Sequence, residues 1–334
     1  MVKTTVRDGN DNVAFVKEEW MKTFNINGEE KEFIFKEVTD PEGAALTTRY
    51  ELYTDEDQEG RYMRRKAEHS SDGSWTMYDY DSEGRKTLVV RPFKDAAWDD
   101  VKDLAVSTAA DQGRATYYDY TPVDQDDSLQ ENDTRPRTIT KKIKGTVVSK
   151  TFRAYKTNAD GEKVEITERA APPSNSYGDS ANLRTTKTYY AESATEAAAG
   201  RLHTVEHPDG RMDTYTYTHG TYDSNADPAG ASFTADPNGE DLKKTITHGT
   251  VDNPAGIANK TTREVTVTTA SGEKPLQETY VYTGTDYERI DWTVKEYDEQ
   301  GRVTATHYSD GTSHQVTWGC CGKEYEKKRN GTEY

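Results

Sequence analysis

Short strand-like runs recur throughout this chain, and the late runs 263–268, 278–282 and 291–295 alternate most clearly. One face of each late run is apolar or aromatic, and the other carries Thr or charge. Such alternation predicts half-buried strands of antiparallel sheets. The runs lie at 12–20, 32–38, 46–53, 75–80, 263–268, 278–282 and 291–295.

Turn and helix signals lie between these runs. Asp8-Gly9 and Asn27-Gly28 are pairs that supply positive φ in tight hairpins. Residues 94–104 carry apolar side chains at helical spacing, which predicts a short helix, and one or two helical turns are expected at 192–199.

One phrase occurs twice and gives the chain its repeat. Tyr80-Asp81-x-x-Gly84-Arg85 returns as Tyr297-Asp298-x-x-Gly301-Arg302. An Asp-Gly pair follows the second copy at Asp310-Gly311, and a related unit contains Asp209-Gly210. We expect the glycines to adopt positive φ in turns, the Tyr rings to pack on a sheet and the Arg side chains to stack or pair with acids. These residues are therefore predicted to be structural.

Repeat-like units lie near 53–92, 200–218 and 297–318. Irregular strands occupy 1–50, and insertions lie near 94–136, 170–199 and 222–260. A recurring turn with a strand on each side indicates units that bury their faces only by stacking on neighbours. We expect one elongated all-β domain over 1–334, in which antiparallel hairpin repeats form an elongated sheet, spiral or partial tube with short helical insertions.

Composition supports thin β-layers. The 334 residues are only 32% hydrophobic, with a mean hydropathy of −1.03, but they include 22 Tyr, 5 Trp and 7 Phe. Aromatic residues bury large areas in strands while Tyr keeps a polar tip. The formal net charge of −17 argues against nucleic-acid partners, whose binding depends on cationic contacts. No run approaches the roughly 20 apolar residues of a membrane span, so none is expected.

The repeated Tyr-Asp-x-x-Gly-Arg phrase, with its Asp-Gly partner, resembles the YD-repeat of RHS-type proteins. That family winds a long β-ribbon into a shell or tube, often around a toxin cargo, or forms secreted and cell-surface structures. The resemblance implies a non-catalytic structural module, located outside the cell or on its surface, that serves as a shell wall, stalk or self-assembling filament segment. Its implied partners are further copies joined end to end, or neighbouring YD-repeats of the same protein.

Two alternatives remain from the residues. Exposed Tyr and Trp on an open sheet face are also typical of carbohydrate-binding or adhesion modules, whose partners would be glycans. Asp227-Pro228 and Asp236-Pro237 resemble segments near the self-cleaving end of RHS shells, which would make the chain a toxin-encapsulating shell with autoproteolysis. The same dipeptides also form ordinary turns.

No cofactor is expected, with calcium as the alternative. Asp55-x-Asp57 and Asp79-x-Asp81 begin like calcium loops, but the Glu required at position 12 is missing from both. If Asp310-Gly311 forms a two-residue hairpin turn, His307 lies opposite His314 and the pair becomes a candidate metal site, although it lacks a third ligand.

The two cysteines, Cys320 and Cys321, are adjacent. Neighbouring Cα atoms lie ~3.8 Å apart across a trans peptide, below the usual ~4.4 Å limit for a disulfide, so free or intermolecular thiols are expected. No phosphate-binding loop, nucleophile elbow or zinc-protease motif is present in the sequence. We therefore expect no enzymatic activity and no catalytic residues.

Overall fold

The structure is a computed structural model that describes residues 1–7, 13–26, 29–41, 43–57, 60–127, 134–225, 227–252 and 261–333. The chain divides into two compact units. The first comprises Met1–Ala154 and Glu168–Leu183, and the second comprises Tyr155–Thr167 and Arg184–Tyr334. In both units the regular structure is almost entirely antiparallel strand, which confirms the predicted all-β antiparallel class.

The strands of the first half of the chain are β1 (Val2–Arg7), β2 (Val13–Ile26), β3 (Glu29–Thr39), β4 (Leu46–Leu52), β5 (Arg65–Ser70), β6 (Trp75–Tyr80), β7 (Lys86–Arg91), β8 (Arg114–Asp119), β9 (Thr138–Ile143), β10 (Thr146–Thr157) and β11 (Lys163–Arg169). The remaining strands are β12 (Leu183–Tyr189), β13 (Leu202–Glu206), β14 (Arg211–Asp223), β15 (Ser232–Ala235), β16 (Asp241–Thr250), β17 (Thr262–Thr268), β18 (Leu276–Tyr282), β19 (Tyr287–Tyr297), β20 (Val303–Tyr308), β21 (Ser313–Gly319) and β22 (Gly322–Lys327).

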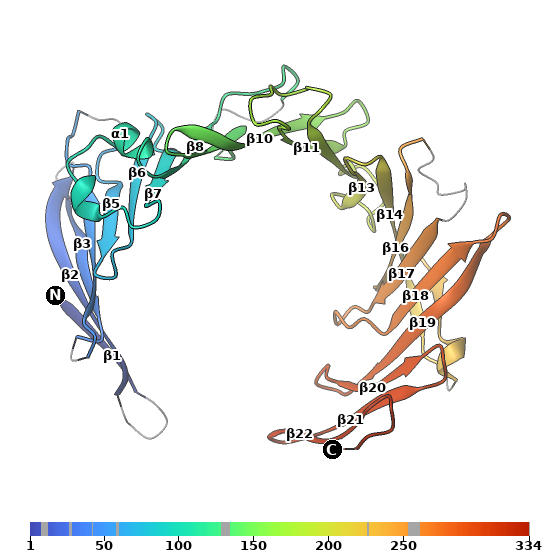
Figure 1. Ribbon diagram of the computed structural model, residues 1–334. Coiled ribbons are helices and arrows are strands. Elements are labelled where there is room, and N and C mark those ends of the chain that lie inside the picture. The colour runs from blue at the N-terminus through green and yellow to red at the C-terminus, as the bar shows by residue number, and fades with distance from the viewer. Residues whose placement is uncertain are drawn as a thin grey trace. The chain divides into compact units, whose positions relative to one another are not determined.

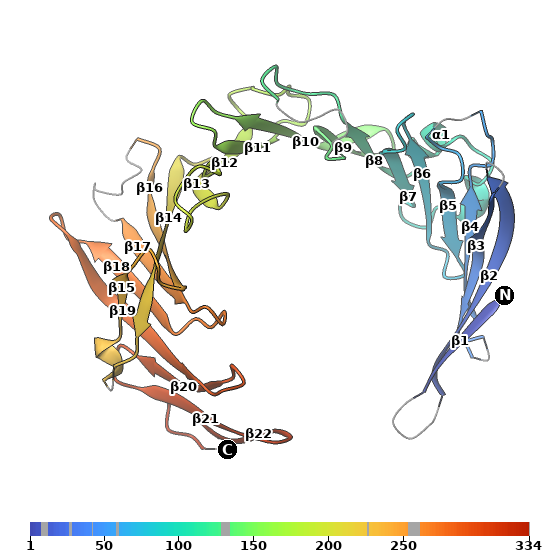
Figure 2. The same ribbon diagram turned by 180° about the vertical axis from the view of Figure 1, so that it is seen from behind.

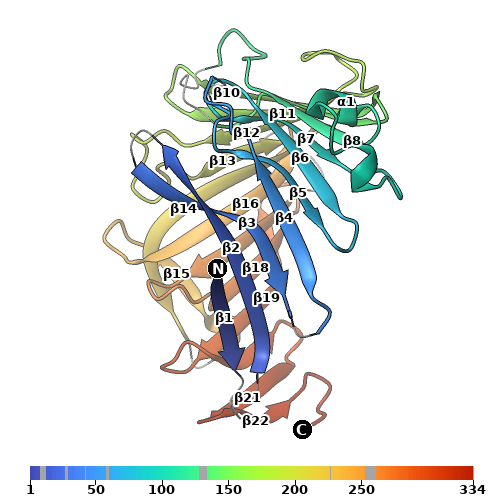
Figure 3. The ribbon, with the colours of Figure 1, turned by 90° about the vertical axis from the view of Figure 1, so that its left-hand side faces the viewer.

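In the first unit each strand from β1 to β9 pairs antiparallel with the strand that follows it in sequence. Figure 3 shows β2 to β6 side by side in this order. Such a meander needs only short connections, since consecutive antiparallel strands can be joined by hairpins.

The core of the first unit lies under a short helix. Trp75, Met77 and Val90 of β6 and β7 are almost fully buried, and α1 (Val106–Ala110) packs Ala109 against the same cluster. Figure 1 shows α1 beside these strands. The indole Nε1 of Trp75 donates a 2.8 Å hydrogen bond to the carbonyl oxygen of Ala96, which ties the insertion after β7 to the sheet.

The second unit is also a meander, with one excursion. Strand β14 pairs with β13, with β16 over ten residue pairs from Arg211–Thr250 to Gly220–Asp241, and with the short β15 at its end. Strands β16 to β22 then pair in sequence order. Figure 2 shows β14 and β16 to β19 as neighbours. A small core of Ala231, Val267, Leu276 and Val294 lies on one face.

The strand predictions are confirmed within a few residues at both ends, except that residues 13–20 of the run expected at 12–20 belong to a longer strand, β2, which runs to Ile26. Residue 12 lies outside the described residues. The helix expected at 94–104 is only a single 3-10 turn, η1 (Trp98–Asp100), and the α-helix lies just beyond the expected range, at α1. Five residues are too few for helical periodicity to be recognised in a sequence. Residues 195–199 form one hydrogen-bonded turn, where the main-chain N–H groups of Ala198 and Ala199 donate to Thr195.

The hairpin turns expected at Asp8-Gly9 and Asn27-Gly28 lie outside the described residues, as do parts of the insertions near 94–136 and 222–260.

Candidate functional site

A single turn geometry recurs along the chain, and it is defined by two main-chain hydrogen bonds. The N–H of the first residue donates to the carbonyl oxygen of the fifth, and a glycine at the fourth position donates back to the first. A type I turn followed by a residue of positive φ is the common form of this three-residue hairpin loop. We call it the repeat turn. In the described part of the chain it occurs eight times, at 70–74, 81–85, 158–162, 207–211, 269–273, 298–302, 308–312 and 328–332.

In the Tyr-Asp-x-x-Gly-Arg copies, an aspartate at the first position caps the turn. Asp81 Oδ1 accepts hydrogen bonds from the main-chain N–H groups of Glu83 (3.1 Å) and Arg85 (2.8 Å), and Oδ2 accepts one from Arg85 Nε at 2.7 Å. Asp298 makes the equivalent bonds to Gln300 and Arg302. Burial alone would raise the pKa of Asp81, but the hydrogen bonds from Arg85 outweigh it and hold the pKa below its ordinary value.

In the Asp-Gly copies, the aspartate that accepts the hydrogen bonds is the third residue of the turn. Asp209 Oδ1 accepts from the main-chain N–H of Arg211 at 3.2 Å, and Asp310 Oδ1 accepts from that of Thr312 at 3.0 Å. Hydrogen bonds from the Thr312 hydroxyl and the Arg329 guanidinium lower the pKa of Asp310 to about 2. The two sequence signals, Tyr-Asp-x-x-Gly-Arg and Asp-Gly, are therefore the same backbone turn with the acid in different positions.

This geometry overturns one prediction. Asp310-Gly311 is not a two-residue turn, because the repeat turn adds a residue to the loop and shifts the register by one. His307 therefore pairs with Ser313, and His314 pairs with Thr306. Since neighbouring residues of a strand face opposite sides, the prediction that His307 lies opposite His314 is wrong.

Each of these two histidines has its own acidic partner. His307 Nε2 lies 2.9 Å from Glu296 Oε1, and His314 Nε2 lies 2.9 Å from Glu326 Oε1. Among the described residues no group of three or more His, Cys, Asp or Glu side chains is arranged to hold a metal ion.

The Tyr and Arg residues of the repeat pack within the sheet. Tyr80 Oη donates a 2.9 Å hydrogen bond to the carbonyl oxygen of Arg65. The Arg85 guanidinium lies 4.3 Å from the centroid of the Tyr120 ring, and Arg302 lies 5.4 Å from that of Trp318. Cations over aromatic faces stabilise by about 0.5–1 kcal/mol at exposed sites. The repeat thus places a guanidinium between its own aspartate and an aromatic ring further along the chain.

The two aspartate runs considered for calcium use their oxygens locally. Asp79 Oδ1 forms a 2.9 Å ion pair with Arg61, Asp81 caps its own turn, and Asp55 Oδ1 accepts from the N–H of Asp57 at 3.2 Å. Glu59, the third acid of the first run, lies outside the described residues.

The Asp-Pro segments form capped turns. Asp227 Oδ1 accepts a 3.1 Å hydrogen bond from the N–H of Ala229, at the start of the 3-10 helix η2 (Pro228–Gly230). Asp236 Oδ1 accepts from the N–H of Asn238 at 2.9 Å. Autoproteolysis at these segments stays a prediction.

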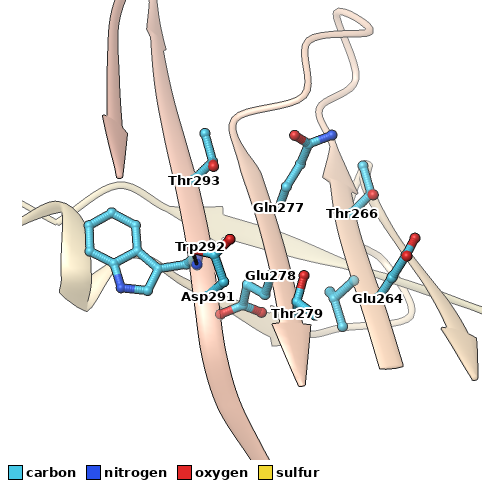
Figure 4. A pocket seen from close by; sticks show the side chains of 9 residues that line it. Glu264, Thr266, Gln277, Glu278, Thr279, Asp291, Trp292 and Thr293 are labelled. Atoms are coloured by element: carbon cyan, nitrogen blue, oxygen red, sulfur yellow. Dashed lines mark hydrogen bonds between the residues drawn. The ribbon is translucent and has the colours of Figure 1, made fainter. Parts of the chain in front are cut away.

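A groove of about 290 Å³ crosses β17, β18 and β19 in the second unit (Figure 4). By the register of these strands, Glu264, Thr279 and Asp291 form one polar row, and a second row follows two residues along. The indole of Trp292 packs against the small core of this unit. The groove is lined by hydroxyl, amide and carboxyl groups together with Trp292.

The structure contains a buried ion pair that the sequence does not predict. The side chains of Arg137 and Asp127 are 3% and 0% exposed, and Arg137 Nε lies 2.6 Å from Asp127 Oδ2. Asp127 belongs to a run of acids that predicts only a solvated loop, and Arg137 lies ten residues away. No local pattern signals such a pair.

Comparison with known proteins gives structural matches only. No protein-family model matches the chain, and no curated protein matches it. The solved structure of TcdB2-TccC3 aligns with 94% of this chain and 16% of its own, at 12% identity and a TM-score of 0.28. The same protein without its hypervariable C-terminal region aligns with 99% of this chain and 18% of its own, at 10% identity and a TM-score of 0.32. Because identities and TM-scores are both low, this likeness carries no functional conclusion for the chain, which spans less than a fifth of each of these proteins.

Proposed function

We propose that this chain is a non-catalytic structural β-repeat module of the RHS or YD type, serving as a segment of a larger wall, stalk or filament outside the cell or on its surface. The observation that carries the proposal is the recurrence of the repeat turn. Residues that are chemically capable, Asp81, Arg85, Asp298 and Arg302, are engaged in closing that turn at both copies. A group that is repeated to shape a hairpin is better suited to architecture than to a single active centre.

The sheet edges support an assembling role. In the described part of the chain, β1 is paired along β2 only and β22 along β21 only, apart from a single bridge between Lys327 and Glu333. An edge strand presents unpaired N–H and C=O groups that another strand can extend. We propose that the partner at these edges is a β-strand of another YD-type segment, either from a second copy or from neighbouring repeats.

Sedimentation velocity across a range of protein concentrations tests the self-assembling form of this proposal. Val2 and Val6 on β1 are 47% and 49% exposed. We expect Val2→Lys/Val6→Lys to shift the chain toward monomer, because charges on an edge strand oppose pairing. The matched control is Val148→Lys, since Val148 is 46% exposed on β10 of the same unit.

Two outcomes would contradict the self-assembling form. The unmutated chain would sediment as a monomer at every concentration, or the β1 double variant and the Val148→Lys control would associate to the same extent. Negative-stain images of the unmutated chain provide an independent check on whether associated species are filaments or closed particles.

The location proposed here rests on the resemblance of the repeat phrase. Among the described residues no helix is long and apolar enough to cross a membrane.

A further inference from the structure

The last hairpin carries two free thiols at its tip. Gly319 of β21 pairs with Gly322 of β22, so Cys320 and Cys321 are the two residues of the connecting turn. Both cysteines are free and exposed, and their Sγ atoms lie 3.2 Å apart. Two sulfur atoms are thus held side by side in solvent, where a ligand can reach both at once.

A direct disulfide between them is disfavoured. The Cα atoms of adjacent residues lie ~3.8 Å apart across a trans peptide, below the ~4.4 Å that disulfides usually require. A disulfide would require the two sulfurs to move closer together. A ligand atom that bonds to both sulfurs does not, because it bridges them at their present distance. Two bonds of about 2.3 Å from such an atom to sulfurs 3.2 Å apart enclose an angle of about 90°.

The S–ligand–S angle of about 90° limits which class of ligand atom fits between the two sulfurs. Zinc prefers four ligands in a tetrahedron, and no third His, Cys, Asp or Glu completes such a group in the described residues. A linear two-coordinate ion would need the sulfurs much further apart. Trivalent arsenic is soft, forms pyramidal compounds with bond angles close to a right angle, and needs only two sulfurs from the protein when it carries one organic substituent.

We propose that Cys320 and Cys321 form a binding site for organic trivalent arsenicals. In the reaction R–As=O + 2 Cys–SH → R–As(S–Cys)₂ + H₂O, two As–S bonds replace the As=O bond. Both thiol protons leave with the oxygen as water, and arsenic remains trivalent, so no oxidant or reductant is needed. The second thiolate acts at high effective concentration, and such linkage strengthens binding by about 10²- to 10⁴-fold over a single thiol.

The backbone around the turn favours this arrangement. Gly322 has a φ of +143°, a conformation that side chains other than glycine adopt poorly. A Cβ placed on Gly319 would meet the carboxylate of Glu324, the end of a flexible side chain, which would have to move aside. Glycine on both sides therefore leaves the cysteines as the side chains that project from the tip.

Phenylarsine oxide added to the reduced 334-residue chain tests the site. We expect native mass spectrometry to show one arsenical per chain, and one equivalent to block both thiols against maleimide. Excess 2-mercaptoethanol should leave the complex intact, whereas the dithiol 2,3-dimercaptopropanol should remove the arsenical. Cys320→Ser and Cys321→Ser should each bind about 10²- to 10⁴-fold more weakly, because each retains one sulfur.

Three results would overturn the proposal. One is an arsenical shared between two chains, which would make the thiols an intermolecular site. Another is that one equivalent of phenylarsine oxide protects only one of the two thiols from maleimide. The third is that either single-cysteine variant binds the arsenical as tightly as the unmutated chain does. The measurement on the unmutated chain decides the matter without any variant, and circular dichroism checks the fold of both substituted chains.

Discussion

The hydroxyl of Tyr190 donates a 2.9 Å hydrogen bond to the main-chain carbonyl oxygen of Tyr215. Tyr53 and Tyr78 make the same bond, also at 2.9 Å and also across 25 residues. The first pair lies in the second compact unit and the other pair in the first. Each unit therefore contains the same kind of internal contact. Tyr53 and Tyr190 are thus equivalent residues of the repeat, although the Tyr-Asp-x-x-Gly-Arg phrase does not include them.

Removing this hydroxyl should destabilise the chain. We expect Tyr53→Phe and Tyr190→Phe each to lower the free energy of unfolding by about 1 kcal/mol, because a part-buried carbonyl loses its donor. Tyr118→Phe is the control, since the hydroxyl of Tyr118 makes no hydrogen bond within the described residues. Urea denaturation measures the difference, and equal effects at Tyr53 and Tyr118 would show that the contact adds no stability.

The glycines of the turns should differ in their tolerance of alanine. Gly60, Gly84 and Gly311 all have positive φ, at +73°, +77° and +78°. At Gly311 a Cβ would meet nothing, so Gly311→Ala should cost about 1–2 kcal/mol for the backbone conformation alone. At Gly84 the Cβ would displace the flexible guanidinium of Arg64, and at Gly60 it would strike the carbonyl oxygen of Asp81.

We therefore expect the loss of stability to rise in the order Gly311→Ala, Gly84→Ala, Gly60→Ala. Thermal denaturation of the three variants measures it. The reverse order would mean that the close approach of Gly60 to the next turn does not constrain the backbone.

The buried ion pair should be the most sensitive polar contact of the first unit. We expect Arg137→Met to lower stability by about 3–5 kcal/mol, because it leaves the carboxylate of Asp127 buried without this partner. The matched control is Arg211→Met, whose pair with Asp209 is 70% and 55% exposed, so solvent screens it and its loss should change stability little. Denaturant titration distinguishes the two, and a small effect at Arg137 would show that Asp127 is satisfied without it.

Alkaline pH should unfold the chain through its tyrosines. Burial, followed by the charge of Asp79, raises the pKa of Tyr53 from 10.0 to about 12, and burial also raises those of Tyr50 and Tyr78 to about 12. The folded state therefore holds these protons more tightly than the unfolded state. Their contribution to stability is fully present below pH 10 and is lost as pH rises through about 12.

Ultraviolet absorbance of tyrosinate and circular dichroism, followed over the same titration, test this expectation. We expect the last ionisations to coincide with loss of sheet signal. Complete ionisation near pH 10 with the sheet intact would contradict the raised pKa values.

The local chemistry of the repeat could be predicted from sequence because it depends on neighbours in the chain. Alternation at 263–268 or 291–295 is visible in the residues themselves, and Gly84 or Gly301 signals a turn because glycine adopts positive φ most readily. Register could not be predicted in the same way. One additional loop residue in the 308–312 turn moved His307 away from His314, since a shift of one position changes the face of every side chain.

The sequence by itself determined that this protein is an all-β chain of antiparallel hairpins closed by glycine turns, because alternation and turn chemistry act over a few residues. Only the tertiary structure decided that Asn158, Thr269 and Lys328 begin the same turn as Asp81, and that Tyr53 reaches Tyr78. It also decided that Arg137 is buried against Asp127. The repeat turn depends on backbone hydrogen bonds, which many different side chains allow. The Tyr53 and Arg137 contacts join residues that are distant in sequence, and no local pattern predicts such contacts.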